Sequence, residues 1–141
     1  MNKILKKLNI KKIDYQKLDS KMQENYNFQK ASAVLADYGF VTNLLSYDWK
    51  HADFLAQHKN GVWFKVQLKG RLTCNPKYIE NDLYIMFQDK NIKEAPWYFY
   101  PHDDFMSYVK QIKPSSAGAL KGFDTKSVSV KYRKWLEDYK I

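Results

Sequence analysis

The segment that decides the fold reads His51-Ala-Asp-Phe-Leu-Ala56, then Lys59-Asn-Gly61, then Val66-Gln-Leu-Lys-Gly-Arg71. Asn-Gly readily adopts the positive φ angles of a tight hairpin turn. It therefore predicts two antiparallel strands, at 51–57 and at 62–69. The second strand alternates apolar side chains with polar or aromatic ones, as is typical of a strand with one buried face.

Asp53, Gln67 and Lys69 are the chemically active side chains of this hairpin. Residues two apart in a strand share a face, so Gln67 and Lys69 point the same way, and pairing can bring Asp53 beside them. A carboxylate, an amide carbonyl and an ammonium at one sheet edge are suited to hold a divalent cation and a phosphate.

Working outward, apolar residues at three- and four-residue spacing predict a helix from about Asp14 to Tyr38, capped by Asp19 or Ser20 and stopped by Gly39. An extended run follows at Phe40–Leu45, and Ser46–Trp49 is expected to break it. The remaining predicted elements are strands at 83–87 and 97–100, a helix opening with capping residues at His102-Asp103-Asp104, a loop at 114–118 and an amphipathic helix at 128–141.

This order predicts an α/β (α+β) fold, in which a central mixed sheet of five strands is flanked by helices in the order αβββββα, with a C-terminal helix. We expect residues 1–113 to form the core together with a basic N-terminal segment. We expect residues 114–141 to form a linker and a basic helix that packs on the core or on a partner.

The charge of the chain is strongly positive, with 24 Lys and Arg against 15 Asp and Glu, a formal net charge of +9. Such a field attracts polyanions, of which nucleic acid is the commonest. The excess of Lys over Arg also suits an AT-rich genome, so charge alone leaves a merely basic soluble protein open. The segment 1–13 is either a basic amphipathic arm or a solvated extension.

The single cysteine, Cys74, excludes an internal disulfide and a cysteine-based zinc site, and a packing role is expected for it. No apolar run is long enough to span a membrane, and no signal-peptide pattern follows the basic start. We therefore expect a cytoplasmic protein without a membrane partner.

Four stretches of the chain together resemble the PD-(D/E)XK nuclease superfamily, which includes restriction endonucleases, Holliday-junction resolvases and some homing endonucleases. Lys30–Phe40 looks like the family's first helix with its glycine stop, Ala52–Ala56 like the first motif, Val66–Arg71 like the second, and Pro101–Asp103 like the strand-to-helix step after the active site. The resemblance covers roughly Tyr26 to Val109 and implies a restriction-endonuclease-like core.

The chain departs from the family pattern at two positions. Ala52 replaces the proline before Asp53, and Gln67 replaces the acid of the second motif, as in some branches of the superfamily. The family's first helix often adds a glutamate. Here Glu24 is the nearest acid, and Gln29 lies closer to the expected position.

The resemblance implies that Asp53, Gln67 and Lys69 are catalytic, with Asp53 and Gln67 as ligands of Mg²⁺ (or Mn²⁺) and Glu24 as a further candidate ligand. Lys69 would contact the scissile phosphate or orient and deprotonate the attacking water. His51 is a weaker candidate on the face of Asp53. For each of these residues a structural role remains open: a turn contact for Asp53, an edge-strand amide for Gln67 and an exposed lysine at 69.

Basic residues outside the motif are candidate contacts to DNA phosphates, which give salt-dependent affinity without base specificity. They are Lys65, Arg71, Lys77, Lys131, Arg133 and Lys134. The leading hypothesis is a metal-dependent DNA endonuclease that acts as a homodimer, because cutting both strands of a duplex suits a two-fold enzyme. The alternatives are a nuclease-fold protein that binds nucleic acid or a protein partner without turnover, and a protein-interaction module whose charge is incidental.

Overall fold

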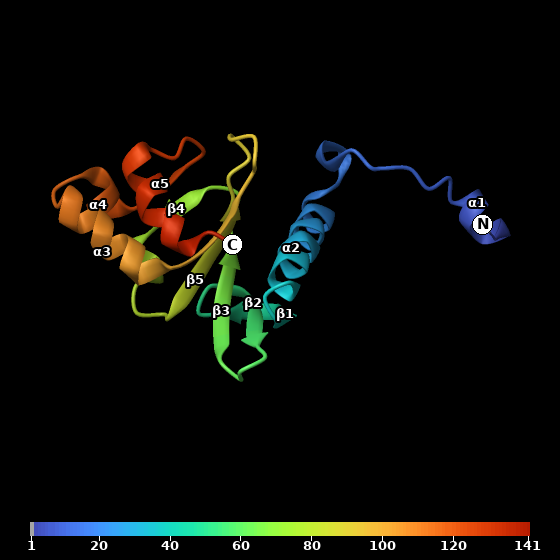
Figure 1. The fold of residues 1–141 in the computed structure, drawn as a ribbon, viewed down its shortest axis with the longest axis horizontal. Coiled ribbons are helices and arrows are strands. Elements are labelled where there is room, and N and C mark those ends of the chain that lie inside the picture. The colour runs from blue at the N-terminus through green and yellow to red at the C-terminus, as the bar shows by residue number, and fades with distance from the viewer. Residues whose placement is uncertain (1) are drawn as a thin grey trace.

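The computed structural model describes residues 2–141, so Met1 of the predicted N-terminal segment lies outside the described residues (Figure 1). Its helices are α1 (Lys3–Lys7), α2 (Ser20–Ala36), α3 (His102–Ile112), α4 (Ala117–Lys121) and α5 (Val130–Leu136), with 3₁₀ turns η1 (Tyr15–Lys17), η2 (Pro76–Tyr78) and η3 (Glu137–Tyr139). Its strands are β1 (Phe40–Trp49), β2 (Ala52–His58), β3 (Trp63–Leu68), β4 (Leu72–Cys74), β5 (Leu83–Gln88), β6 (Trp97–Pro101) and β7 (Phe123–Thr125).

A mixed sheet forms the centre of the molecule. Within residues 2–141, five strands pair in the order β1-β2-β3-β5-β6, with β3 and β5 parallel and the other pairs antiparallel. Helix α2 covers one face, and α3, α4 and α5 lie on the other side (Figure 1). The predicted fold class, a five-stranded mixed sheet flanked by helices, is confirmed.

Helix α2 is shorter than the predicted helix, because a 3₁₀ turn at Tyr15–Lys17 precedes it. Asp19 is the N-cap, and its carboxylate accepts a hydrogen bond from the Met22 amide at 2.9 Å. Gly39 follows the helix with φ +83°, the left-handed conformation predicted for its stop.

Two hairpins join β1, β2 and β3. The predicted break at Ser46–Trp49 is an irregularity in the pairing of β1 with β2, whose regular register is interrupted between Leu44 and Trp49. It does not end the strand, because β1 continues to Trp49 and turns at Lys50 and His51, which have φ of 51° and 69°. Asp48 stabilises this turn, since its carboxylate accepts a hydrogen bond from the His51 amide at 3.1 Å. The predicted placement of His51 on the strand face of Asp53 is therefore wrong.

The second hairpin turns at Asn60-Gly61 as predicted, with Gly61 at φ +93°. Its register pairs Phe54 with Val66, which sets Asp53 opposite Gln67 at the end of the ladder. The buried side chains of β2, β3 and β5 pack with those of α2 in one cluster: Ala31, Leu35, Phe54, Ala56, Val66 and Met86. Burial of this apolar face is what holds the register.

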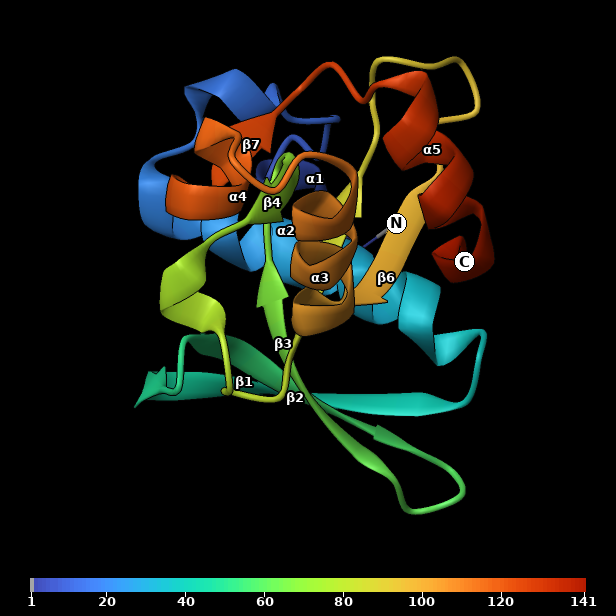
Figure 2. The ribbon, with the colours of Figure 1, turned by 90° about the vertical axis from the view of Figure 1, so that its left-hand side faces the viewer.

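The other face of the sheet carries the larger cluster, which includes Tyr100, Phe105 and Leu136, all without exposed surface. Helix α5 enters this cluster through Leu136, and the amide of Ile141 donates a hydrogen bond to the carbonyl of Trp97 at 3.0 Å. Figure 2 shows α3 and α5 on this side of the sheet, with β6 beneath α5.

A second sheet pairs β4 with β7 and was not predicted. Gly122, at φ +83°, precedes β7, and a Cβ there would lie 2.5 Å from the carbonyl oxygen of Cys74. Only glycine therefore fits this approach. Cys74 is fully buried, as its predicted packing role requires, and burial raises the pKa of its thiol to about 11.

The N-terminal segment lies away from the sheet. Figure 1 shows α1 separated from the rest of the chain by an extended stretch. Its apolar side chains Ile4, Leu8, Ile10 and Ile13 are each more than half exposed. None of the helices in residues 2–141 combines the length and apolarity needed to cross a membrane.

Candidate active site

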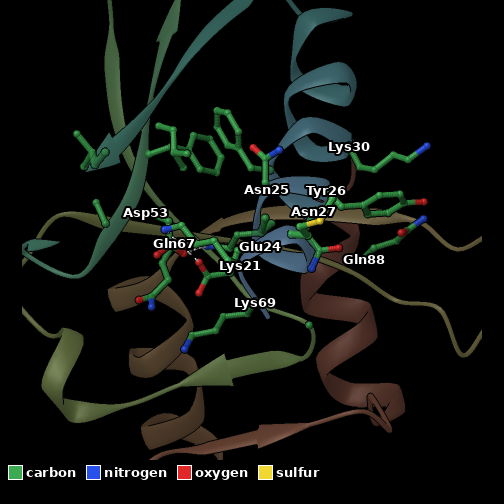
Figure 3. A pocket seen from close by; sticks show the side chains of 18 of the residues that line it. Lys21, Glu24, Asn25, Tyr26, Asn27, Lys30, Asp53, Gln67, Lys69 and Gln88 are labelled. Carbon is green, nitrogen blue, oxygen red and sulfur yellow. Dashed lines mark hydrogen bonds and ion pairs between the residues drawn. The ribbon is translucent and has the colours of Figure 1, made fainter. Parts of the chain in front are cut away.

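Asp53, Gln67 and Lys69 line one cavity of about 1330 Å³ at the end of the hairpin, and Glu24 of α2 lines it as well. Figure 3 shows these four side chains toward the same end of the cavity, with Tyr26, Asn27 and Gln88 toward the other. The structure thus brings together the three motif residues predicted from the hairpin and the helical acid suggested beside them.

Asp53 lies at the start of β2, and its Oδ2 accepts a hydrogen bond from the Leu68 amide of β3 at 2.8 Å. Its side chain reaches the cavity surface, yet partial burial raises the pKa of its carboxyl. The Leu68 amide and the Lys69 charge oppose this, while Glu24 and Asp48 raise the pKa further. The carboxylate therefore sits where a nearby cation would favour its ionised form.

Gln67 has a polar side-chain atom whose hydrogen bonding is unsatisfied. Its Oε1 is buried, and among the described residues it has no hydrogen-bond partner. Buried polar atoms in proteins are almost always satisfied. A carbonyl oxygen left open beside a carboxylate fits a hard divalent cation or a bound water.

The acids around the cavity do not form a dense cluster. Across residues 2–141 no group of three or more His, Cys, Asp and Glu side chains is placed to hold a metal ion. Mg²⁺ nevertheless binds through one or two carboxylates together with waters and substrate phosphates. Asp53 and Gln67 would therefore hold Mg²⁺ together with waters, and a substrate phosphate would add further oxygen ligands.

Glu24 approaches the motif from α2 and is exposed, with an ion pair to Lys21 at 4.0 Å. Its charge raises the pKa of Asp53, so the two carboxylates lie within electrostatic reach of each other. Gln29, the other helical candidate, is exposed and does not line this cavity.

Asp48 was missed by sequence reasoning. It lines the cavity from the end of β1 and raises the pKa of Asp53. The signal was present: had the strand pattern been continued through Ser46–Trp49, the hairpin would have returned Asp48 to the start of β2. Lys21, Asn25, Lys30 and Lys90 also line the cavity and were not singled out.

Lys69 rests on an aromatic ring. Its Nζ lies 5.6 Å from the ring centroid of Tyr78, and Nζ of Lys77 lies 5.1 Å from the same centroid. Tyr78 is buried and is contacted edge-on by the rings of His51 and His102, with distances between ring centroids of 5.1 and 5.4 Å. A cation above an aromatic face is attracted to it, so this ring restrains the Lys69 ammonium beside the cavity.

The predicted phosphate contacts are dispersed. Lys65 lies over the ring of Trp49 at 5.6 Å, and Arg71 pairs with Asp124 at 3.0 Å. Arg133 pairs with the buried Asp89 at 3.1 Å, so its guanidinium is engaged in an ion pair within the protein. Lys131 and Lys134 are exposed on α5 and do not line the cavity.

Helix α3 begins at His102 with Asp103 and Asp104 in its first turn, as predicted, but the side chain of His102 does not cap it. Its ring is fully buried, Nε2 accepts a hydrogen bond from the Asn75 amide at 3.0 Å, and Nδ1 lies 2.9 Å from Oδ1 of Asp103. The other carboxylate oxygen of Asp103 accepts from the Glu80 amide at 3.0 Å. These bonds tie α3 to the two ends of the turn that carries Tyr78.

Burial lowers the pKa of His102, although Asp103 opposes this. A histidine whose pKa is lower in the folded state stabilises the protein fully above its unfolded pKa, about 6.5, and loses that contribution as pH falls below it. As the pH is lowered from 6.5 to the folded pKa of His102, the free energy of unfolding should decrease more steeply in the wild type than in His102→Gln. The difference in slope should reach up to about 1.4 kcal/mol per pH unit. Urea unfolding of both proteins from pH 7.5 to 5 measures this, and equal slopes would contradict it.

Comparison with solved structures finds a protein of similar fold. It is the bacterial homing endonuclease I-Ssp6803I, which is 18% identical in sequence and superposes with a TM-score of 0.50 over 86% of each chain. No protein-family model matches the chain. No curated protein sequence matches it either. At this level of identity the likeness establishes the fold, which is the nuclease-like fold expected from the sequence.

Proposed function

We propose that this protein is a metal-dependent endonuclease of the PD-(D/E)XK type that hydrolyses phosphodiester bonds in DNA with Mg²⁺ or Mn²⁺. The observation that carries the proposal is the buried Oε1 of Gln67, which lacks a partner among the described residues and lies across the hairpin from Asp53. A second support is Lys69, which lines the same cavity and offers a positive charge for a phosphate.

Asp53 and Gln67 would hold the metal, with Glu24 as a further ligand. When bound, the ion supplies Lewis-acid neutralisation of the charge on the scissile phosphate. Lys69 donates hydrogen bonds to a non-bridging phosphate oxygen and orients the attacking water. The water oxygen joins phosphorus as one P–O ester bond breaks, which yields a phosphate monoester and a hydroxyl.

The experiment that tests this function is incubation of the protein with supercoiled plasmid, linear duplex, branched DNA and RNA, each in Mg²⁺, Mn²⁺ or EDTA. Metal-dependent nicking of DNA, absent in EDTA, supports the proposal. Intact DNA under every metal condition, with DNA binding retained, would sink it.

One observation favours a second candidate, a nuclease-fold protein that binds nucleic acid without turnover. Gln67 places a neutral oxygen where a carboxylate would bind a hard cation more strongly. The plasmid experiment separates the two candidates, because only the first requires cleavage.

The charge at position 67 can be restored by Gln67→Glu. We expect this variant to bind Mn²⁺ about ten-fold more tightly, because it adds a second ionised oxygen ligand beside Asp53. Isothermal titration calorimetry measures the affinity. Gln88→Glu is the matched control, because Gln88 lines the same cavity but its amide already donates to the carbonyl of Ala95. Equal gains in both variants would show a general charge effect and contradict a ligand role for Gln67.

We also propose that the enzyme is cytoplasmic and acts as a homodimer, since cleavage of both strands suits two-fold symmetry. Exposed apolar side chains on the two hairpins are available for such an interface: Val41, Leu44, Tyr47, Trp49, Val62 and Trp63. Sedimentation velocity on the protein bound to duplex DNA tests the dimer, and a strictly monomeric complex would contradict it.

A further inference from the structure

A second hollow adjoins the cavity. It is a groove of about 440 Å³ that shares Lys69 and Gly70 with the cavity. Arg71, Lys77 and Lys121 also line it. The groove therefore begins at the lysine proposed to contact the scissile phosphate.

The groove is built by the small β4–β7 sheet. This pairing sets Thr73 opposite Asp124 and brings Lys121, which precedes Gly122, to the same groove as Lys77. The close approach of Gly122 to Cys74 makes this arrangement possible, because a side chain there would collide with the backbone. Residues about 50 apart in the sequence thus meet in one basic groove.

The charge of the groove is strongly unbalanced. Four basic side chains line it, whereas its acid, Asp124, is already paired with Arg71 at 3.0 Å. Within residues 2–141, neither Lys77 nor Lys121 forms an ion pair with a carboxylate. A linear polyanion satisfies such a groove better than a single anion.

One aromatic ring contacts a lysine of the cavity and a lysine of the groove. The ring of Tyr78 lies beneath the ammonium groups of both Lys69 and Lys77. Gly70 lines both hollows without a side chain, and a Cβ there would meet no atom within 4 Å. A chain of phosphates can therefore pass over Gly70 without obstruction.

We propose that this groove binds the sugar–phosphate backbone of duplex DNA on one side of the scissile phosphate. The assignment of DNA rests on the proposed function. The strand that is cut runs from the cavity at Lys69 over Gly70 into the groove, where Lys77 and Lys121 each contact a phosphate. These contacts set the position of the strand and carry no sequence information.

The test is the double variant Lys77→Ala/Lys121→Ala. Binding of a fluorescent 30-base-pair duplex is measured by anisotropy in EDTA, between about 50 and 200 mM salt, so that cleavage plays no part. The slope of log K against log[salt] is negative, and each lost phosphate contact makes it less steep by about 0.9. The expected result is a slope less steep by about 2 and an affinity at least ten-fold weaker, with an unchanged circular dichroism spectrum.

The matched control is Lys110→Ala/Lys113→Ala at the end of α3, because both lysines are exposed and line neither hollow. It should keep the wild-type slope. Equal loss in both double variants, an unchanged slope in the groove variant, or no DNA binding by the wild type would each overturn the groove. Stronger competition by duplex RNA than by duplex DNA would overturn the assignment of DNA.

The groove and the proposed function can fail separately. Loss of binding in the groove variant of a protein that never cleaves DNA supports the groove and rejects the enzyme. Metal-dependent cleavage by a protein whose groove variant binds as tightly as wild type rejects the groove and leaves the enzyme.

Discussion

Asp53→Asn is expected to lower the rate of DNA cleavage by about a thousand-fold or more, because it removes the carboxylate proposed as the principal metal ligand. The amide keeps an oxygen that can accept the hydrogen bond of the Leu68 amide, now 2.8 Å from the carboxylate, so the strand ends should stay joined. Initial rates of plasmid nicking in Mg²⁺ measure the change.

Two further measurements make the Asp53→Asn result specific. Mn²⁺ affinity, followed by calorimetry, should fall together with the rate, while the thermal unfolding midpoint stays within a few degrees of wild type. Asp104→Asn on α3 is the control, because Asp104 is exposed and lines neither hollow. A variant at position 53 that nicks DNA within ten-fold of wild type would contradict the ligand role.

Lys69→Met should lower the cleavage rate by roughly a hundred- to a thousand-fold, the usual cost of removing one group that stabilises charge in a transition state. Methionine keeps an unbranched apolar side chain that can pack on Tyr78 but cannot donate to a phosphate. Because the charge is lost and the packing is largely kept, metal binding should change far less than the rate.

The control for Lys69 is Lys65→Met on the same strand. Lys65 shares the face of Lys69 and also lies over an aromatic ring, that of Trp49, but it does not line the cavity. A loss of rate in Lys65→Met as large as that in Lys69→Met would show that both lysines act through general attraction of DNA. Nicking rates at saturating protein concentration separate that attraction from chemistry.

Elements with strong local signals were predictable from the sequence. The Asn60-Gly61 turn, the Asp19 cap and the Gly39 stop each depend on the conformational preferences of a few adjacent residues. The strands β2, β3, β5 and β6 were found because their apolar residues follow a strand pattern that burial then enforces.

Elements that depend on distant partners were missed. The turn at Lys50 and His51 places two adjacent non-glycine residues at positive φ, which is uncommon, so the local sequence suggested an end to β1. Strands β4 and β7 have three residues each and gain stability only from each other. His102 looked like a capping residue because its bond to the Asn75 amide joins segments 27 positions apart.

The sequence by itself determined the motif: Asp53 and Lys69 lie on a hairpin whose turn and strand pattern set their register, because both strands are local to one another. Only the tertiary structure decided what surrounds that motif. Packing of α2 on the sheet brought Glu24 to Asp53, and the β4–β7 pairing made the basic groove that begins at Lys69. Such contacts arise from burial of apolar surface between distant segments, which the spacing of residues along the chain does not encode.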